Sequence, residues 1–187
     1  MVLASDLRSG MAVRYEKHSY KVVEAEYHPG QGKMGGQTHV RLKNLDTGTL
    51  WEHSLRADLK LEEVPLERKA LDFLYSDADA AYFMDPESYE QVVVPLAIIG
   101  PQAKFLLPEK RFPVEFIGDR AVSVQFPELM EVHIADTAPP AHQQVDSAWK
   151  SAKLENGVEV KVPQFIKTGD AIRLDLATLK YVDRVKK

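Results

Sequence analysis

The stretch HPGQGKMGGQTHVRL, from His28 to Leu42, decides how the amino-terminal part of the chain folds. Its last five residues, Thr38 to Leu42, alternate between polar and apolar side chains, as a strand with one buried face does. The residues before them include four glycines and Lys33, in a connection of about ten residues, which is long for a hairpin loop. We therefore predict a β-hairpin whose exposed, glycine-rich tip carries Lys33.

The glycines of this tip do not form a nucleotide-binding motif. Gly30 to Gly35 has the spacing G-x-G-x-x-G, but a dinucleotide fingerprint opens a helix, and here a strand follows. A Walker loop needs Ser or Thr after its lysine, whereas Met34 follows Lys33. Two interpretations of Lys33 stay open: a solvated side chain on a flexible loop, and a cation that a partner approaches closely because glycine leaves room.

The rest of the chain repeats this pattern of short strands separated by turn residues. Gly10, Asp46-Thr47-Gly48 and Asn156-Gly157 are typical of these turns, because Gly, Asn and Asp tolerate the backbone angles that tight turns require. Runs such as Val158 to Val162 lie between the turns and alternate with period two. Turns that recur about every ten residues predict an all-β fold.

Three segments depart from the simple strand pattern. Proline near a first helical position predicts helical turns from Pro86 to Gln91 and from Pro95 to Leu106. The segment from Leu66 to Tyr75 suits a helix and a strand equally well.

Prolines also suggest the domain organisation. Pro65 and Pro127 bracket a middle segment about as long as the segments on either side, so we predict three β modules: residues 1–64, 65–127 and 128–187. Modules of this size are marginal alone, and packing between neighbours is expected to help stabilise them. Residues 137–147, with two consecutive prolines and few apolar residues, predict a surface loop.

Composition excludes several classes of protein. The 187 residues are 44% hydrophobic, carry a net charge of −4 and include no cysteine. This apolar content suffices for a core, and the absence of cysteine excludes disulfides, thiol catalysis and cysteine-based metal sites. No apolar run approaches the roughly 18 to 20 residues of a membrane span, and the first residues lack the features of a signal peptide. We expect a cytoplasmic protein with no membrane contact.

Catalytic and metal-binding motifs are not found in the sequence. There is no G-x-S-x-G elbow, and the six histidines show no H-x-x-x-H or H-E-x-x-H spacing. His39 and His53 are interpreted as surface or hydrogen-bonded residues, and Asp77 and Asp79 as turn residues that bond the backbone. We predict neither an enzyme nor a site for a metal or cofactor.

Aromatic and basic residues offer weaker indications of binding. Trp51, Trp149 and Tyr82 are interpreted as core or rim aromatics rather than as platforms for stacked bases. The segment from Lys180 to Lys187 has four basic residues and one acidic residue, interleaved with Tyr181. It is either a solvated edge strand or an RNA backbone contact.

Segments spread over essentially the whole chain carry a resemblance to a known family. They are Asp6 to Met11, Pro29 to Lys33, Leu42 to Thr49, Tyr75 to Asp77, Phe83-Met84, Val160 to Asp170 and Tyr181 to Arg184. Together they resemble bacterial elongation factor P, which is related to the hypusine-carrying eukaryotic initiation factor. The run from Val160 to Asp170 is the most specific of them.

The resemblance implies a fold. It is an all-β chain in which an SH3-like (KOW-type) barrel is followed by two OB-fold barrels, in an L-shaped arrangement that mimics tRNA. It also implies that Leu66 to Tyr75 forms a strand.

The resemblance also implies a function. By family, the protein binds the ribosome beside peptidyl-tRNA, as a monomer, and promotes peptide-bond formation at consecutive prolines. Lys33 matches the loop-tip residue that contacts the tRNA acceptor end and, in some lineages, is a target of a lysine-modifying enzyme. The loop around it consists of Pro29, Gly30, Gln31, Gly32, Met34, Gly35 and Gly36. Tyr181 and Arg184 match an RNA-binding pair.

Two positions differ from the family pattern, and one alternative function stays open. Met34 stands where family members commonly have glycine, and the segment from Ala141 to Ser147 replaces a loop that usually contains Gly-Asp-Thr. The alternative is an OB-fold protein that binds single-stranded RNA off the ribosome, which the balanced charge disfavours.

Overall fold

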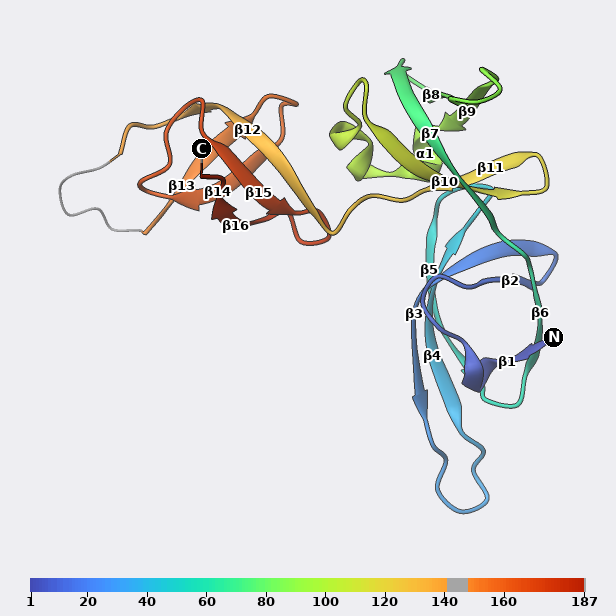
Figure 1. Ribbon diagram of the computed structural model, residues 1–187. Coiled ribbons are helices and arrows are strands. Elements are labelled where there is room, and N and C mark those ends of the chain that lie inside the picture. Colours follow the sequence, from blue (N-terminus) through green and yellow to red (C-terminus); the bar gives the residue numbers. More distant parts are fainter. Residues whose placement is uncertain (141–147, 187) are drawn as a thin grey trace. The chain divides into compact units, whose positions relative to one another are not determined.

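The computed structural model describes residues 1–140 and 148–186, which form three antiparallel sheets with only short helical turns (Figure 1). The chain divides into two compact units, Met1–Gln125 and Phe126–Lys187. The first unit holds two of the sheets and the second unit holds the third. In this described part of the chain, no helix is long and apolar enough to cross a membrane. The prediction of an all-β fold is confirmed.

The first sheet has the strand order β1-β6-β2-β3-β4-β5. Its elements are β1 (Val2–Leu3), the 3-10 turn η1 (Ala4–Asp6), β2 (Ala12–Tyr15), β3 (His18–His28), β4 (Gln37–Asn44), β5 (Leu50–Arg56) and β6 (Lys60–Glu63). Alternate residues such as Val13, Val40 and Leu42 point inward and are fully buried. The period-two pattern of the sequence therefore identifies the core face of this sheet correctly.

The second sheet has the order β11-β10-β7-β8-β9. Its elements are β7 (Glu67–Ser76), β8 (Ala80–Met84), β9 (Gln91–Pro95), α1 (Leu96–Ile99), the 3-10 turn η2 (Pro101–Phe105), β10 (Arg111–Ile117) and β11 (Arg120–Val124). The ambiguous segment from Leu66 to Tyr75 is thus a strand, as the family resemblance implied. The helical turns predicted between Pro95 and Leu106 are confirmed.

The helical turn predicted from Pro86 to Gln91 is wrong. These residues form the tight connection between β8 and β9, in which Tyr89 adopts a positive φ of 58°. The Asp85 carboxylate accepts the backbone N–H of Glu87 at 2.8 Å and that of Ser88 at 3.3 Å. The same two bonds would also cap a helix, but the backbone N–H of Asp85 donates to the carbonyl of Glu90 at 2.9 Å and closes the hairpin of β8 and β9. Strand pairing therefore takes precedence over the helix-starting proline.

The third sheet has the order β14-β13-β12-β15-β16. Its strands are β12 (Leu129–Thr137), β13 (Trp149–Leu154), β14 (Glu159–Pro163), β15 (Ala171–Asp175) and β16 (Lys180–Arg184). Its first strand pairs with its second and fourth, as in the second sheet, which is the connectivity expected for two OB folds. Of the loop predicted at residues 137–147, Thr137 ends β12, and Ala141 to Ser147 lie outside the described residues.

The first two sheets share a boundary within the first unit, whereas the three-module division of the chain stays a prediction. A cluster of buried residues joins them: Ala12, Leu45 and Val64 pack with Val122. Gly48, in the turn between β4 and β5, lies against the second sheet so closely that a Cβ atom there would sit 2.1 Å from the carbonyl oxygen of Ala97. Its positive φ of 77° is a second reason for glycine at this position.

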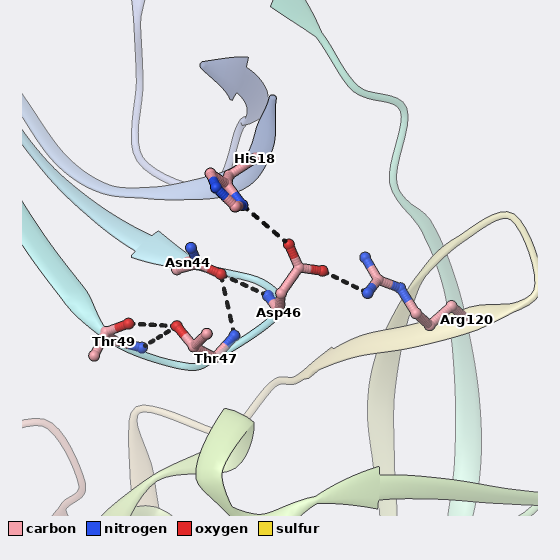
Figure 2. Close-up of polar contacts among 6 residues, drawn as sticks. All are labelled: His18, Asn44, Asp46, Thr47, Thr49 and Arg120. Atoms are coloured by element: carbon pink, nitrogen blue, oxygen red, sulfur yellow. Dashed lines mark hydrogen bonds and ion pairs between the residues drawn. The ribbon is translucent and has the colours of Figure 1, made fainter. Parts of the chain in front are cut away.

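Polar contacts reinforce this boundary. Figure 2 shows Asp46 between His18 of β3 and Arg120 of β11, with the Arg120 guanidinium donating to its carboxylate at 2.5 Å. The side chain of Asn44 accepts the backbone N–H groups of Asp46 and Thr47, so that the turn is held in shape. Asp46 is therefore both a turn residue and a partner for the neighbouring sheet.

A buried carboxylate lies deeper in the same boundary. The side chain of Glu115, on β10, is 2% exposed and accepts from Lys21 Nζ of β3 at 2.6 Å. It also accepts from Arg68 at 3.1 Å and from Gln125 at 2.5 Å. Removing a carboxylate from water is costly, and these hydrogen-bonding and charged partners compensate that cost. The network therefore stabilises the contact between β3 and β10.

Candidate nucleic-acid interface

The hairpin of β3 and β4 presents the loop that the sequence singled out. Pairing continues to His28↔Gln37, so Pro29 to Gly36 form the connection. In Figure 1 this connection extends beyond the other strands of its sheet. The backbone N–H of Met34 donates to the carbonyl of Gln31 at 3.2 Å, which makes a turn around Lys33. The predicted hairpin with an exposed Lys33 at its tip is confirmed.

The glycines of the tip have different structural roles. A Cβ atom on Gly30 would lie 1.9 Å from the carbonyl oxygen of Met34, and one on Gly36 would lie 2.7 Å from the ring of Tyr27. Gly32 adopts a positive φ of 63°, which glycine tolerates best. Gly35 has open space around it. Three of the four glycines are therefore required by the shape of the loop.

The cations near the hairpin are not equivalent. Arg41, on β4, lies 3.3 Å from the carboxylate of Glu52 on β5. Lys43 is half-buried, and its burial, with a smaller effect from the charge of Lys21, lowers the pKa of its amine. Lys33 is exposed at the tip. The cation that is best placed to meet a partner is Lys33.

The second predicted pair, Tyr181 and Arg184, lies on β16. A separation of three would place the two side chains on opposite faces of a regular strand. The pairing with β15 shifts here, because Arg173 faces Asp183 while Leu174 faces Tyr181, which leaves Val182 as an extra residue. The extra residue of such a bulge shifts the alternation of side chains between the two faces by one position. Tyr181 and Arg184 therefore lie on the same side of the strand.

Aromatic rings surround both members of this pair. The ring centroids of Tyr181 and Trp149 are 6.2 Å apart at 72°, and the Arg184 guanidinium lies 5.5 Å from the ring centre of Phe165. Trp149 and Phe165 are 49% and 51% exposed. Burial, followed by the charge of Asp183, raises the pKa of Tyr181, while the charge of Arg184 opposes that rise. Tyr181 therefore keeps its proton and is able to donate a hydrogen bond.

The residues that the sequence assigned to structure have structural contacts. Asp77 accepts the backbone N–H groups of Asp79 and Ala80 at 2.8 Å and the hydroxyl of Tyr82 at 2.9 Å. The backbone bonds are the largest cause of the lowered pKa of Asp77. Asp77 is therefore a turn residue, as predicted.

The interpretations of the histidines and tryptophans are similarly supported. His39 lies 3.4 Å from the hydroxyl of Ser54, and His53 stacks on Trp51 at 4.8 Å between centroids. Trp51 packs against the core of the first sheet.

Over residues 1–140 and 148–186, no group of three or more acidic or histidine side chains could hold a metal ion.

The sequence did not reveal which side chains from distant segments meet. Trp149 and Tyr181 come from β13 and β16, two strands that do not pair with each other, and Lys21 and Glu115 are 94 positions apart. Local periodicity says which face of a strand each residue occupies, but it does not say which strands lie side by side. An alignment of covarying positions is the kind of signal that identifies such contacts.

Family models match three consecutive parts of the chain. Residues 3–61 match the elongation factor P KOW-like domain, residues 66–124 the elongation factor P OB domain, and residues 130–184 the elongation factor P C-terminal domain. The KOW-like match covers the first sheet, and the OB match covers the second, in agreement with the fold class expected for them.

Individual relatives match over full length. Elongation factor P from Roseiflexus sp. (strain RS-1) is 35% identical over 195 residues and covers 100% of both chains. Elongation factor P from Enterococcus faecalis is 32% identical over 188 residues, again with 100% of each chain covered. Among solved structures, eukaryotic translation initiation factor 5A from Methanococcus jannaschii is 22% identical, with a TM-score of 0.44, and covers 66% of this chain and 90% of that one.

Proposed function

Since the chain belongs to the elongation factor P family of translation elongation factors, we propose that it binds the ribosome beside peptidyl-tRNA and promotes peptide-bond formation at consecutive prolines. The observation that carries the proposal is the exposed Lys33 at the tip of the β3–β4 hairpin. A cation at this place contacts the phosphates of the tRNA acceptor end. Tyr181 and Arg184 make a second contact, with an RNA backbone.

The hairpin suits this role because its two long strands are paired with each other and its connecting loop is rich in glycine. The 11 residues of β3, at roughly 3.3 Å per residue, span about 35 Å, and β4 pairs with most of that length. Because half of the eight connecting residues are glycines, the tip presents only the side chains of Pro29, Gln31, Lys33 and Met34 to a partner. The stem therefore carries Lys33 away from the sheet, and the tip allows close approach.

The proposed mechanism is positional. Proline reacts slowly as donor and acceptor because its ring restricts the geometry of attack. A cation along the acceptor-end phosphates limits the motion of the peptidyl-tRNA and so increases the fraction of time in which the reacting atoms are aligned. Alignment of this kind contributes large factors in rate without any bond chemistry by the aligning group. The ribosome supplies the reaction centre, and the protein is not itself an enzyme.

The exposed amine of Lys33 also makes it the proposed target of a lysine-modifying enzyme. Intact-protein mass spectrometry on material from the native host, followed by fragmentation, tests this part. Added mass on the peptide that contains Lys33 would support it. An unmodified mass would remove the modifying enzyme as a partner and would leave the ribosomal function to be tested separately.

The function is tested by reconstituted translation with and without the full chain. Two templates of equal length are compared, one with three consecutive proline codons and one with those codons replaced by alanine codons. We expect the protein to increase full-length product on the proline template only. No increase, or an equal increase on both templates, would contradict the proposal. Absence of rescue together with tight binding to bare oligonucleotides would favour a single-strand RNA-binding protein that acts off the ribosome.

A further inference from the structure

A hollow lies on the surface of the second unit, whereas the hairpin and its lysine belong to the first. Its volume is about 660 Å³, and its lining includes Trp149 and Ser151 of β13, Glu159 and Lys161 of β14, and Lys180 and Tyr181 of β16. The three strands are the second, third and fifth of an OB fold. The face of the second and third strands is where OB folds in general bind oligonucleotides.

Trp149 forms the aromatic wall of this hollow. Residues alternate along β13, so that Trp149 faces outward while its neighbour Lys150 is buried. The Lys150 ammonium donates to the carbonyl oxygens of Ile166, at 2.7 Å, and of Ala138. These bonds hold β13 in place, and Trp149 therefore stands on its outer face. Tyr181 packs edge to face beside it, at 6.2 Å between centroids.

Two ammonium groups flank the aromatic wall. Lys161 donates to the hydroxyl of Ser151 at 2.7 Å, which holds its side chain over the outer face of the sheet. Lys180 follows a turn in which Asp175 accepts the backbone N–H groups of Ala177 and Thr178 at 2.9 and 3.1 Å. Among the described residues of the lining, Glu159 is the one carboxylate, so these residues have a net charge of +1.

We propose that this hollow binds one unstacked base of a single-stranded RNA, which stacks on Trp149 while Lys161 and Lys180 contact the phosphates on either side of it. A half-exposed indole provides a stacking surface that accepts any base, and ammonium groups nearby follow the backbone. Trp149 is then a binding residue as well as a rim aromatic. The inference goes beyond the proposed function, because it adds a stacked base on Trp149 beside the proposed backbone contact of Tyr181, and it does not depend on Lys33.

Nuclear magnetic resonance on the full chain tests the proposal directly. The chain has two tryptophans, so the indole N–H signal of Trp149 is identified by its loss in Trp149→Phe, and Trp51 is an internal control. We expect titration with a nine-nucleotide oligouridine to shift the Trp149 signal and to leave that of Trp51 in place. Binding is also measured by fluorescence anisotropy of a labelled oligouridine at several salt concentrations.

Variants separate stacking from charge. We expect Trp149→Ala to weaken binding at least fivefold, the lower end of the effect of removing one stacking aromatic, and Trp149→Phe to retain most of the affinity. Lys161→Ala and Lys180→Ala should each reduce the slope of log affinity against log salt by about 0.7, as expected for one phosphate of a single strand. Lys33→Ala should bind the oligouridine like the unchanged protein. A failure of the base-binding proposal can therefore be told apart from a failure of the proposed function, which proline rescue tests.

Three results would overturn the proposal. Unchanged affinity of Trp149→Ala, with a normal circular dichroism spectrum, would remove the indole from the site. An equal shift of the Trp149 signal with inorganic polyphosphate would mean that charge alone is bound. A shift with a nine-residue oligoglutamate but none with oligouridine would assign the hollow to an acidic protein segment.

Discussion

The carbonyl oxygen of Met34 lies 1.9 Å from the position that a Cβ atom would take on Gly30. Any side chain at residue 30 therefore forces the backbone of the tip to move, and Lys33 moves with it. We expect Gly30→Ala to reduce rescue on a template with consecutive prolines several-fold. Because the loop is exposed, we expect the melting temperature to change by less than about 2 °C.

Gly35→Ala is the matched control for this change. Gly35 lies in the same loop, its φ is not positive, and no atom lies within 4 Å of the Cβ position. It should retain rescue. Equal loss of rescue in both variants would mean that flexibility of the tip, rather than its shape, is what matters.

The ion pair between Lys21 and Glu115 should contribute to stability. Glu115 is 2% exposed, and its Oε2 atom is 2.6 Å from Lys21 Nζ. Lys21→Ala removes the most buried cation of this network and leaves Glu115 with Arg68 and Gln125, so we expect it to lower the free energy of unfolding by about 2 kcal/mol. Urea denaturation measures the change.

A surface pair provides the comparison. Arg14 and Glu62 are 3.2 Å apart, and their side chains are 49% and 56% exposed. Arg14→Ala should lower the free energy of unfolding by less than about 1 kcal/mol. Similar losses in Lys21→Ala and Arg14→Ala would show that the network around Glu115 contributes no more than a solvated pair.

Lys43 should oppose stability. Burial, with a smaller effect of the Lys21 charge, lowers the pKa of its amine below the ordinary value of 10.5. A lysine whose pKa is lower in the folded state destabilises that state at every pH below the lowered pKa, and the effect disappears as the pH rises through 10.5.

We therefore expect Lys43→Met to raise the melting temperature at pH 7, by a few degrees at most, and the gain to shrink as the pH approaches 10.5. Lys60→Met, at an exposed position of β6, controls for the added methionine. A gain in Lys43→Met that is as large at pH 10.5 as at pH 7 would assign the effect to packing instead of charge.

Most of the fold follows from local chemistry that the sequence displays. Alternating runs such as Val158 to Val162 become strands because one face is buried, and the loop around Lys33 is recognisable from its length and glycine content alone. The segment from Pro86 to Gln91 shows the limit of this reasoning. A proline after an Asp signals a helix start and a turn equally well, and the long-range pairing of β8 with β9 decides for the turn.

The parts that local pattern misses depend on long-range pairing. The bulge at Val182 comes from a register shift between β15 and β16, and nothing in the alternation of β16 marks the extra residue. The sequence identifies Trp149 as a rim aromatic. It does not indicate that the ring of Tyr181 lies beside it, because β13 and β16 come together only in the folded barrel. The site around Glu115 has the same origin, because Lys21 lies in a different sheet.

The bulge at Val182 leads to a prediction for the carboxy-terminal strand. Because Tyr181 and Arg184 share a side, we expect both to face one RNA strand, with the guanidinium on a phosphate. Arg184→Ala should weaken ribosome binding several-fold and reduce the salt dependence by about one phosphate, while it leaves the melting temperature nearly unchanged.

Arg173→Ala is the control for this variant. Arg173 lies on the neighbouring strand and makes two contacts with the carboxylate of Asp183, one of them at 2.6 Å. It should bind ribosomes like the unchanged protein. Unchanged ribosome affinity and a lower melting temperature in Arg184→Ala would make Arg184 a structural residue, held by its contact with Phe165.

The rate of peptide-bond formation between consecutive prolines in a reconstituted system shows whether Lys33 acts as a positioning cation. The compared proteins are the unchanged chain, Lys33→Ala and Lys60→Ala, which removes an exposed lysine far along the chain from the tip. We expect Lys33→Ala to lose most of the acceleration with an unchanged melting temperature, and Lys60→Ala to keep it. Acceleration by Lys33→Ala at the level of the unchanged chain would show that Lys33 is not the positioning cation.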